Sequence, residues 1–196
     1  MKNKQVAPSL RFKKANGEDY PPWEQRKLKD FTSSYSGGTP SVSNKNYYNG
    51  TIPFIRSGEI SGEKTELFIS EEGLNKSSAK RVQKGQTLYA LYGATSGEVS
   101  LSKIDGAINQ AILAISTNEG YSNAYLACWL RKEKGKITAT FLQGGQGNLS
   151  GEIVKNLTVP VPNQSEQTKI GHFFERLDDL ITLHQRVQFF RSTRKE

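Results

Sequence analysis

The chain has few of the residues that usually carry metal binding, covalent cross-links or nucleophilic chemistry. Among its 196 residues there are one cysteine, one methionine and two histidines. A single cysteine excludes an internal disulfide framework and is typical of a reducing compartment. One cysteine and two histidines, which lie twelve residues apart at His172 and His184, also give no ligand cluster for zinc. These scarcities argue against a disulfide-stabilised domain and against a metalloenzyme.

Long apolar segments are also missing. No stretch approaches the roughly 20 apolar residues that a membrane-spanning helix needs. The first residues, MKNKQVAPSLRFKK, lack the apolar centre of a signal peptide. The sequence therefore predicts a cytoplasmic protein without a membrane partner.

Motifs for nucleotide or methyl-transfer chemistry are absent or incomplete. Tyr20-Pro21-Pro22-Trp23 is close to the site of amino-methyltransferases, but Tyr20 stands where an asparagine or aspartate must accept from the target amine. The chain has no phosphate-binding loop of the G-x-x-x-x-G-K-[ST] type and no complete G-x-G-x-x-G loop after a strand. No spacing of acidic residues and lysine suggests a nuclease core. We therefore expect a non-catalytic protein.

Positive charge is what the chain has in excess. Lys and Arg number 27 against 19 Asp and Glu, which gives a net charge of +8. This excess favours a polyanionic partner such as nucleic acid. Part of it lies in the terminal segments, where charges are often only solvated.

The most regular pattern lies near the C-terminal end. Asn163 is placed to cap a helix, and Glu166, three residues on, to reach back in a capping box. Apolar residues and one histidine then recur at spacings of three and four: Ile170, Phe173, Phe174, Leu177, Leu180, Ile181 and His184. From Asn163 to Arg186 the helix would be about 35 Å long. Such a narrow stripe is typical of a helix packed along a partner helix, and a helix folded back on its own domain is the alternative.

The remaining pattern predicts an α+β fold with a mixed sheet. Residues 1–22 are expected to form a polar arm, 23–162 a globular domain and 163–196 the long helix of coiled-coil type. Helices are predicted at 23–35, with Trp23, Leu28 and Phe31 inward, and at 121–130 and 136–142, with a short helix or turn at 75–83. Strands are predicted at 51–56, 65–69, 87–91, 98–101, 111–116 and 153–161, and 37–50 is expected to be a loop.

Several segments, taken in order, resemble one family. They are Trp23-Glu24-Gln25-Arg26-Lys27-Leu28, Ser36-Gly37-Gly38-Thr39-Pro40-Ser41, Pro53-Phe54-Ile55-Arg56-Ser57-Gly58-Glu59-Ile60, Asn109-Gln110-Ala111-Ile112, Gly144-Gly145-Gln146-Gly147-Asn148-Leu149-Ser150, and Glu166-Gln167-x-Lys169-Ile170 with Phe173-Phe174 and Leu177-Asp178. Their order resembles the DNA-specificity (S) subunits of type I restriction–modification systems. A typical S subunit holds two target-recognition domains and two conserved helices, whereas this chain has one of each.

The resemblance implies a non-catalytic subunit that binds a half-site in double-stranded DNA. It would recruit a methyltransferase (M) subunit, which uses S-adenosylmethionine, and a restriction (R) subunit, which uses ATP and Mg²⁺. No cofactor would bind to this chain itself. With one helix per chain, an antiparallel homodimer is expected through a seam of Ile170, Phe174, Leu177, Ile181 and His184.

Three loops have the residue types that read DNA, namely 37–50, 56–62 and 143–150. Arginine suits guanine, glutamine suits adenine, and lysine or hydroxyl groups suit phosphate. The candidates are Thr39, Ser41, Lys45, Tyr47, Tyr48, Arg56, Ser57, Gln143, Gln146 and Asn148. Arg56 is the best guanine candidate, with an ion pair to Glu59 as the alternative, while Gln143 and Gln146 are the adenine candidates. Tyr89 and Tyr92 are expected in the core.

Three other interpretations remain open. The chain could be a DNA enzyme in its own right, which the missing motifs argue against. It could be an interaction protein such as a DNA mimic, although a mimic should be acidic. It could also be a truncated or regulatory fragment of an S subunit, because the sequence VQFFRSTRKE after Arg186 departs from the family's usual helix.

Overall fold

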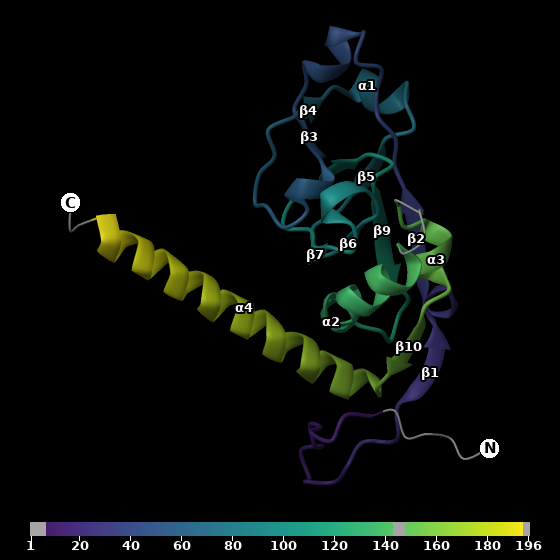
Figure 1. Ribbon diagram of the computed structural model, residues 1–196, viewed down its shortest axis with the longest axis vertical. Coiled ribbons are helices and arrows are strands. Elements are labelled where there is room, and N and C mark those ends of the chain that lie inside the picture. Colours follow the sequence, from purple (N-terminus) through teal and green to yellow (C-terminus); the bar gives the residue numbers. More distant parts are fainter. Residues whose placement is uncertain (1–6, 143–147, 194–196) are drawn as a thin grey trace.

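The computed structural model describes residues 7–142 and 148–193, and their side chains up to residue 187 (Figure 1). Within these ranges, ten strands form two four-stranded sheets and one two-stranded ribbon. A single long helix leaves the base of the domain and runs away from its body (Figure 1). This arrangement confirms the predicted α+β class with a long C-terminal helix.

The central sheet is antiparallel and carries the main core. Its strand order is β2 (Thr32–Ser36), β9 (Ile112–Thr117), β6 (Thr87–Ala90) and β7 (Val99–Leu101). Helix α2 (Asn123–Phe141) covers one face (Figure 1). The core between them includes Leu28, Phe31, Tyr89, Ile115, Leu126 and Leu130, all at most 2% exposed. Tyr89 is thus buried as predicted, and Tyr92 packs against the same cluster.

The second sheet lies beyond the end of the first. Its order is β4 (Phe68–Ile69), β3 (Ile52–Ile55), β8 (Gly106–Ile108) and β5 (Lys80–Val82). Strands β3 and β8 run parallel and the other pairs antiparallel, so this sheet is mixed. The short helix α1 (Glu71–Asn75) begins at Ser70, whose side chain caps it.

The predicted helix at 23–35 is wrong. Residues Glu24–Lys27 form β1, which pairs with β10 (Thr158–Val161) in an antiparallel ribbon. A 3₁₀ turn, Leu28–Asp30, then leads into β2. Leu28 and Phe31 are buried as predicted, because the turn gives them the same spacing that a helix would. The pairing partners lie more than a hundred residues away, so the local pattern could not reveal the strand.

Three other predicted elements differ from the structure. The segment 75–83 lies at the end of α1 and continues into strand β5. The helices expected at 121–130 and 136–142 are one continuous helix, since Gly135 does not interrupt α2. The strand expected at 153–161 is split into helix α3 (Gly151–Lys155), capped by Ser150, and β10.

The last helix, α4 (Gln164–Thr193), begins where predicted and extends further. The Asn163 Oδ1 accepts from the Ser165 N–H at 3.1 Å, which confirms the expected cap. Thirty residues give a length of about 45 Å. The divergent segment after Arg186 continues the helix as far as Thr193. Over the described residues, no helix combines the length and apolarity needed to cross a membrane.

Candidate DNA interface and helix junction

Two of the three donor-rich loops attach to the same end of the central sheet. After β2, the Gly37 N–H donates to the Asn109 carbonyl at 3.2 Å, and the Thr39 hydroxyl donates to the Gln110 side chain at 2.9 Å. At the end of the 143–150 loop, the Leu149 N–H donates to the Leu91 carbonyl at 3.0 Å. These loops therefore lie at the end of the sheet where β2 and β6 end and β9 begins.

Glycine is required where the first loop leaves the sheet. A Cβ on Gly37 would lie 1.8 Å from the Ile108 carbonyl oxygen, and one on Gly38 would lie 2.6 Å from the Ser78 Cβ. Neither contact is possible for a larger residue without a backbone shift. The Gly-Gly pair thus brings the loop against the second sheet and fixes where Thr39 begins the exposed part.

Within the first loop, the candidate residues divide into two groups. The Tyr48 hydroxyl donates to the Pro40 carbonyl at 2.6 Å, and burial raises the pKa of Tyr48. The Tyr47 carbonyl accepts from the Ser70 N–H at 2.9 Å. Ser41 and Lys45 are exposed. The two tyrosines close the loop, and Ser41 and Lys45 are, with Thr39, the candidates that it presents to solvent.

In the second loop, Arg56 is held by two carboxylates. Its guanidinium donates to both Glu59 oxygens, at 3.0 and 2.8 Å, and to Glu66 at 2.5 Å. These hydrogen bonds raise the pKa of Arg56 and lower the pKa of Glu59 to about 2. Ser57 starts the 3₁₀ turn Ser57–Glu59 beside them. A bidentate contact of Nη1 and Nη2 with a guanine edge would require Nη2 to give up Glu59 or Glu66, whereas Nη1 takes part in none of these hydrogen bonds.

The third loop is described only at its end. Gln143 and Gln146 lie outside the described residues, and Asn148 is exposed. The adenine-reading role of Gln143 and Gln146, and DNA contact by Asn148, stay predictions.

One further loop at this end of the sheet is not among the three predicted DNA-reading loops. Residues 92–97 connect β6 to β7, with a 3₁₀ turn at Gly93–Thr95. Gly93 and Gly97 have φ of +73° and +83°, which glycine adopts without strain. In the sequence, this loop was indicated only by two glycines four residues apart between two predicted short strands. Tyr92 and Thr95, both half-buried, add hydroxyl groups to this surface.

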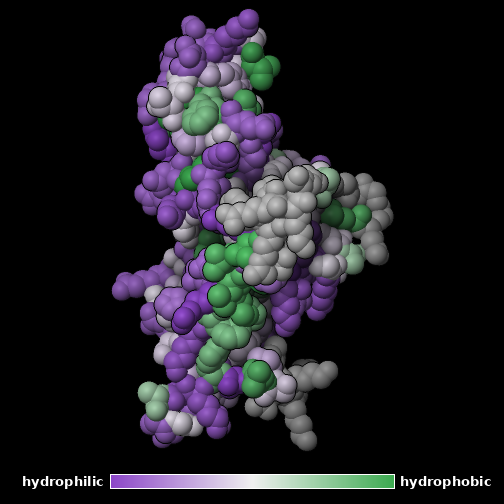
Figure 2. Space-filling view, turned by 90° about the vertical axis from the view of Figure 1, so that its left-hand side faces the viewer, coloured by the Kyte–Doolittle hydropathy of each residue, from purple (hydrophilic) through white to green (hydrophobic). Residues whose placement is uncertain are grey.

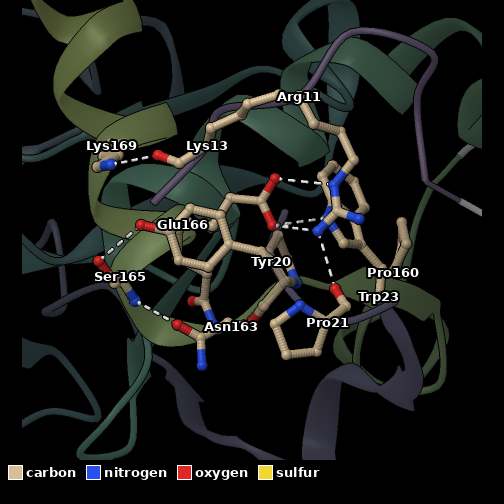
Figure 3. Close-up of polar contacts among 12 residues, drawn as sticks. Arg11, Lys13, Tyr20, Pro21, Trp23, Pro160, Asn163, Ser165, Glu166 and Lys169 are labelled. Atoms are coloured by element: carbon tan, nitrogen blue, oxygen red, sulfur yellow. Dashed lines mark hydrogen bonds and ion pairs between the residues drawn. The ribbon is translucent and has the colours of Figure 1, made fainter. Parts of the chain in front are cut away.

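The first turn of α4 is fixed to the domain by Glu166, whose side chain is 0% exposed. Arg11 donates to its two carboxylate oxygens at 3.0 and 2.6 Å, and the Trp23 indole N–H donates at 3.0 Å (Figure 3). The hydrogen bond to Glu166 raises the pKa of Arg11. The predicted capping-box role of Glu166 is therefore wrong, because its carboxylate faces the N-terminal arm.

Gln167, the next residue, makes a second attachment. Its side chain accepts from the Ser122 N–H at 3.0 Å and donates to the Pro162 carbonyl at 2.8 Å. One turn on, Gly171 lies so close to α2 that a Cβ would be 2.8 Å from the Ala124 Cβ. Adjacent residues thus fix α4 to the arm and to α2, which sets the direction of the helix. The division between arm and domain at residues 22 and 23 stays a prediction.

Beyond its first turns, α4 presents an apolar strip to solvent. Of the predicted seam, Ile170 packs partly against the domain core, while Phe174, Leu177 and Ile181 are 45%, 36% and 55% exposed. His184 is also exposed. Other large apolar residues on this helix are exposed as well: Phe173, Leu180, Leu183 and Val187. Figure 2 shows apolar side chains gathered in a continuous band on the side toward which α4 points.

The groups that could support metal or thiol chemistry are few in the part of the chain that the structure describes. No group of three His, Cys, Asp or Glu residues there could hold a metal ion. Burial raises the pKa of the Cys128 thiol, which disfavours the reactive thiolate. The described domain thus presents loops at one end of its central sheet and an attached helix with an exposed apolar strip.

Comparison with known proteins identifies the class. Residues 20–188 match the family described as the type I restriction modification DNA specificity domain, and the chain belongs to this family. It is 28% identical over 167 residues to the type I restriction enzyme MjaIX specificity subunit of Methanocaldococcus jannaschii, covering 81% of this chain and 38% of that protein. It is 25% identical over 166 residues to the EcoR124I/EcoR124II specificity subunit of Escherichia coli, covering 80% and 41%. The chain thus spans about two fifths of the length of these relatives.

Solved structures share the fold. The type I S subunit from M. genitalium superimposes with a TM-score of 0.65 at 16% identity, covering 84% of this chain and 41% of the other. The HsdS subunit from Thermoanaerobacter tengcongensis gives a TM-score of 0.65 at 18% identity, covering 89% and 42%.

Proposed function

We propose that this chain is the DNA-recognition component of a type I restriction–modification complex and reads one half-site. Membership of the specificity-domain family is the observation that carries the proposal. The net charge of +8 suits a polyanionic partner. In this proposal the chain determines which DNA sequence the complex binds, and it catalyses no reaction itself.

The reading surface in this proposal is the end of the central sheet. Loops 37–50, 92–97 and 148–150 attach there, and the loop that follows Arg56 packs Ile60 against one face of β6. Lys45 and the hydroxyl groups of Thr39 and Ser41 would hold phosphates and set the register on DNA. Arg56, Gln143 and Gln146 would contact base edges.

The scaffold in this proposal is α4. The chain has one such helix, and its apolar strip is exposed along most of its described length. An antiparallel homodimer with twofold symmetry covers two strips at once and holds two recognition domains apart. Such a dimer reads an inverted repeat, and the length of α4 sets the spacer between the two halves.

The catalytic subunits and their cofactors complete the complex. We assign S-adenosylmethionine to the M subunit and ATP with Mg²⁺ to the R subunit. The two subunits would dock on α4 and the adjoining domain of this chain. The complex would act where the cell keeps its DNA, in the cytoplasm.

The direct test is to co-express the chain with its M subunit and to measure co-purification and DNA retention. The proposal predicts a stable complex that retains duplex DNA, with affinity falling steeply as salt rises. A chain that co-purifies with no M subunit and retains no duplex at low salt would contradict it.

A further inference from the structure

A groove opens beside the base of α4, and neither the DNA surface nor the domain core accounts for it. Its volume is about 770 Å³. Three walls enclose it: Leu10 and Phe12 of the arm, Trp129 of α2, and Ile170, Phe173 and Phe174 of α4. Its lining is therefore mainly large apolar side chains.

The arm wall is fixed in place by several contacts. Arg11 is bound to the buried Glu166, and the Lys169 ammonium donates to the Lys13 carbonyl at 2.6 Å (Figure 3). The Phe12 ring meets the Phe173 ring edge-on, with centroids 5.9 Å apart. Leu10 lies at the rim of the groove and is 88% exposed. An exposed leucine on a fixed segment leaves an apolar surface that no other described part of the chain covers.

The groove is continuous with the exposed strip of α4. At about 100° per residue, Ile170, Phe174, Leu177 and Ile181 lie on one side of the helix. The first two line the groove, and the other two continue beyond it. A rod-like apolar partner that follows the strip therefore enters the groove at the base of the helix.

We propose that the groove receives the far end of α4 from a second copy of this chain. This inference rests on the proposed antiparallel homodimer and states where the end of each α4 helix binds on the partner chain. Heptad spacing places Ile170, Leu177 and His184 at one core position, and Phe173, Leu180 and Val187 at the other. In the antiparallel register that uses all six of these residues, Leu177 lies opposite the partner's Leu180. Ile170 then lies opposite the partner's Val187.

Size supports the same occupant. A strip about 10 Å wide on a helix about 45 Å long covers on the order of 450 Å² per chain. Specific dimers bury about 800 Å² per partner. The strip alone therefore buries less area than a specific dimer needs. If each groove encloses a helix end of the partner, the arm and α2 add their surfaces to the buried area. A parallel pair would instead bring the two bases and both domains to the same place.

The first test uses Leu10, which is exposed enough to change without disturbing the fold. Leu10→Asp should weaken the dimer at least about tenfold in sedimentation or light-scattering titrations, since an apolar contact becomes a buried charge. Val42→Asp is the matched control, because Val42 is 78% exposed on a distant loop. Equal dimer affinity in the two variants would overturn the proposal.

The second test uses the only cysteine, Cys128, which lines the groove. In Val187→Cys, a mild oxidant should produce a disulfide-linked dimer that disappears in Val187→Cys/Cys128→Ala. Within one chain the two sites are separated by about 25 Å along α4, too far for a disulfide. Arg186→Cys, one residue away and facing elsewhere on the helix, should cross-link poorly.

The outcomes separate this inference from the homodimer itself. A wild-type dimer that ignores Leu10→Asp and gives no Val187–Cys128 cross-link refutes the groove and leaves the homodimer. A wild-type chain that is monomeric at micromolar concentration refutes both. Cross-linking of Cys128 to the M subunit, with none between Cys128 and Val187→Cys, assigns the groove to that partner and refutes the second copy.

Discussion

The buried ion pair at the helix junction leads to a quantitative prediction. Glu166 has no exposed side-chain surface, and Arg11 supplies two of its three hydrogen bonds. Replacing Arg11 by methionine keeps most of the apolar stem but leaves a buried carboxylate with only the Trp23 indole N–H. Removing one partner of a buried pair costs about 3–5 kcal/mol. Because Arg11 is 17% exposed and so only partly desolvated, we expect about 2–3 kcal/mol for Arg11→Met.

The assay is urea unfolding, with Lys14→Met as the control. Lys14 pairs with Glu18 on the surface, with both side chains well exposed, so its loss should cost less than about 0.5 kcal/mol. Adding Glu166→Gln to Arg11→Met should recover part of the loss, since no charge is then left buried. Equal effects of Arg11→Met and Lys14→Met would refute the role given to this junction.

Three further predictions concern the loops and the strip. The Arg56 hydrogen bonds hold the pKa of Glu59 at about 2, below its ordinary 4.5, so this pair stabilises the fold above about pH 4.5 and the gain is lost as pH falls toward 2. Glu59→Gln should remove about 1–2 kcal/mol of that pH dependence in acid unfolding, after allowance for solvent screening. Arg56→Ala should reduce discrimination between bases by about 1–3 kcal/mol. Lys45→Ala should instead weaken binding to all DNA sequences equally and lower the salt dependence by about one ion. If Arg56→Ala keeps full discrimination, Arg56 serves only in its ion pairs with Glu59 and Glu66. Leu177→Asp should convert the dimer to a folded monomer that no longer prefers DNA with two half-sites; an intact dimer in sedimentation would contradict the seam.

The sequence predicted those parts of the structure that depend on local spacing. The apolar positions of α4 recur every three or four residues over more than four turns, and Asn163 marks its start. The strands β3, β6, β7 and β9 are short apolar runs between turn residues. In each case the pattern that indicates the element lies within a few residues of the chain, even where the pairing strand is distant.

The parts that failed depend on distant partners. Glu24–Lys27 is a strand because β10 lies beside it, and nothing in its own residues indicates that pairing. Glu166 has the spacing of a capping box, but Arg11, more than 150 residues earlier, binds its carboxylate. For Arg56 the sequence offered guanine reading or an ion pair with Glu59; the ion pair is present, Glu66 joins it, and base contact remains a prediction.

Selection of bound duplexes from a randomised DNA library, by the chain in complex with its M subunit, tests the central claim most directly. Two identical recognition domains held apart by paired α4 helices predict enrichment of an inverted repeat with a spacer of fixed length. Leu177→Asp should abolish the fixed spacer under the same conditions. Enrichment of one unsplit, asymmetric motif, or of no motif, would contradict the account.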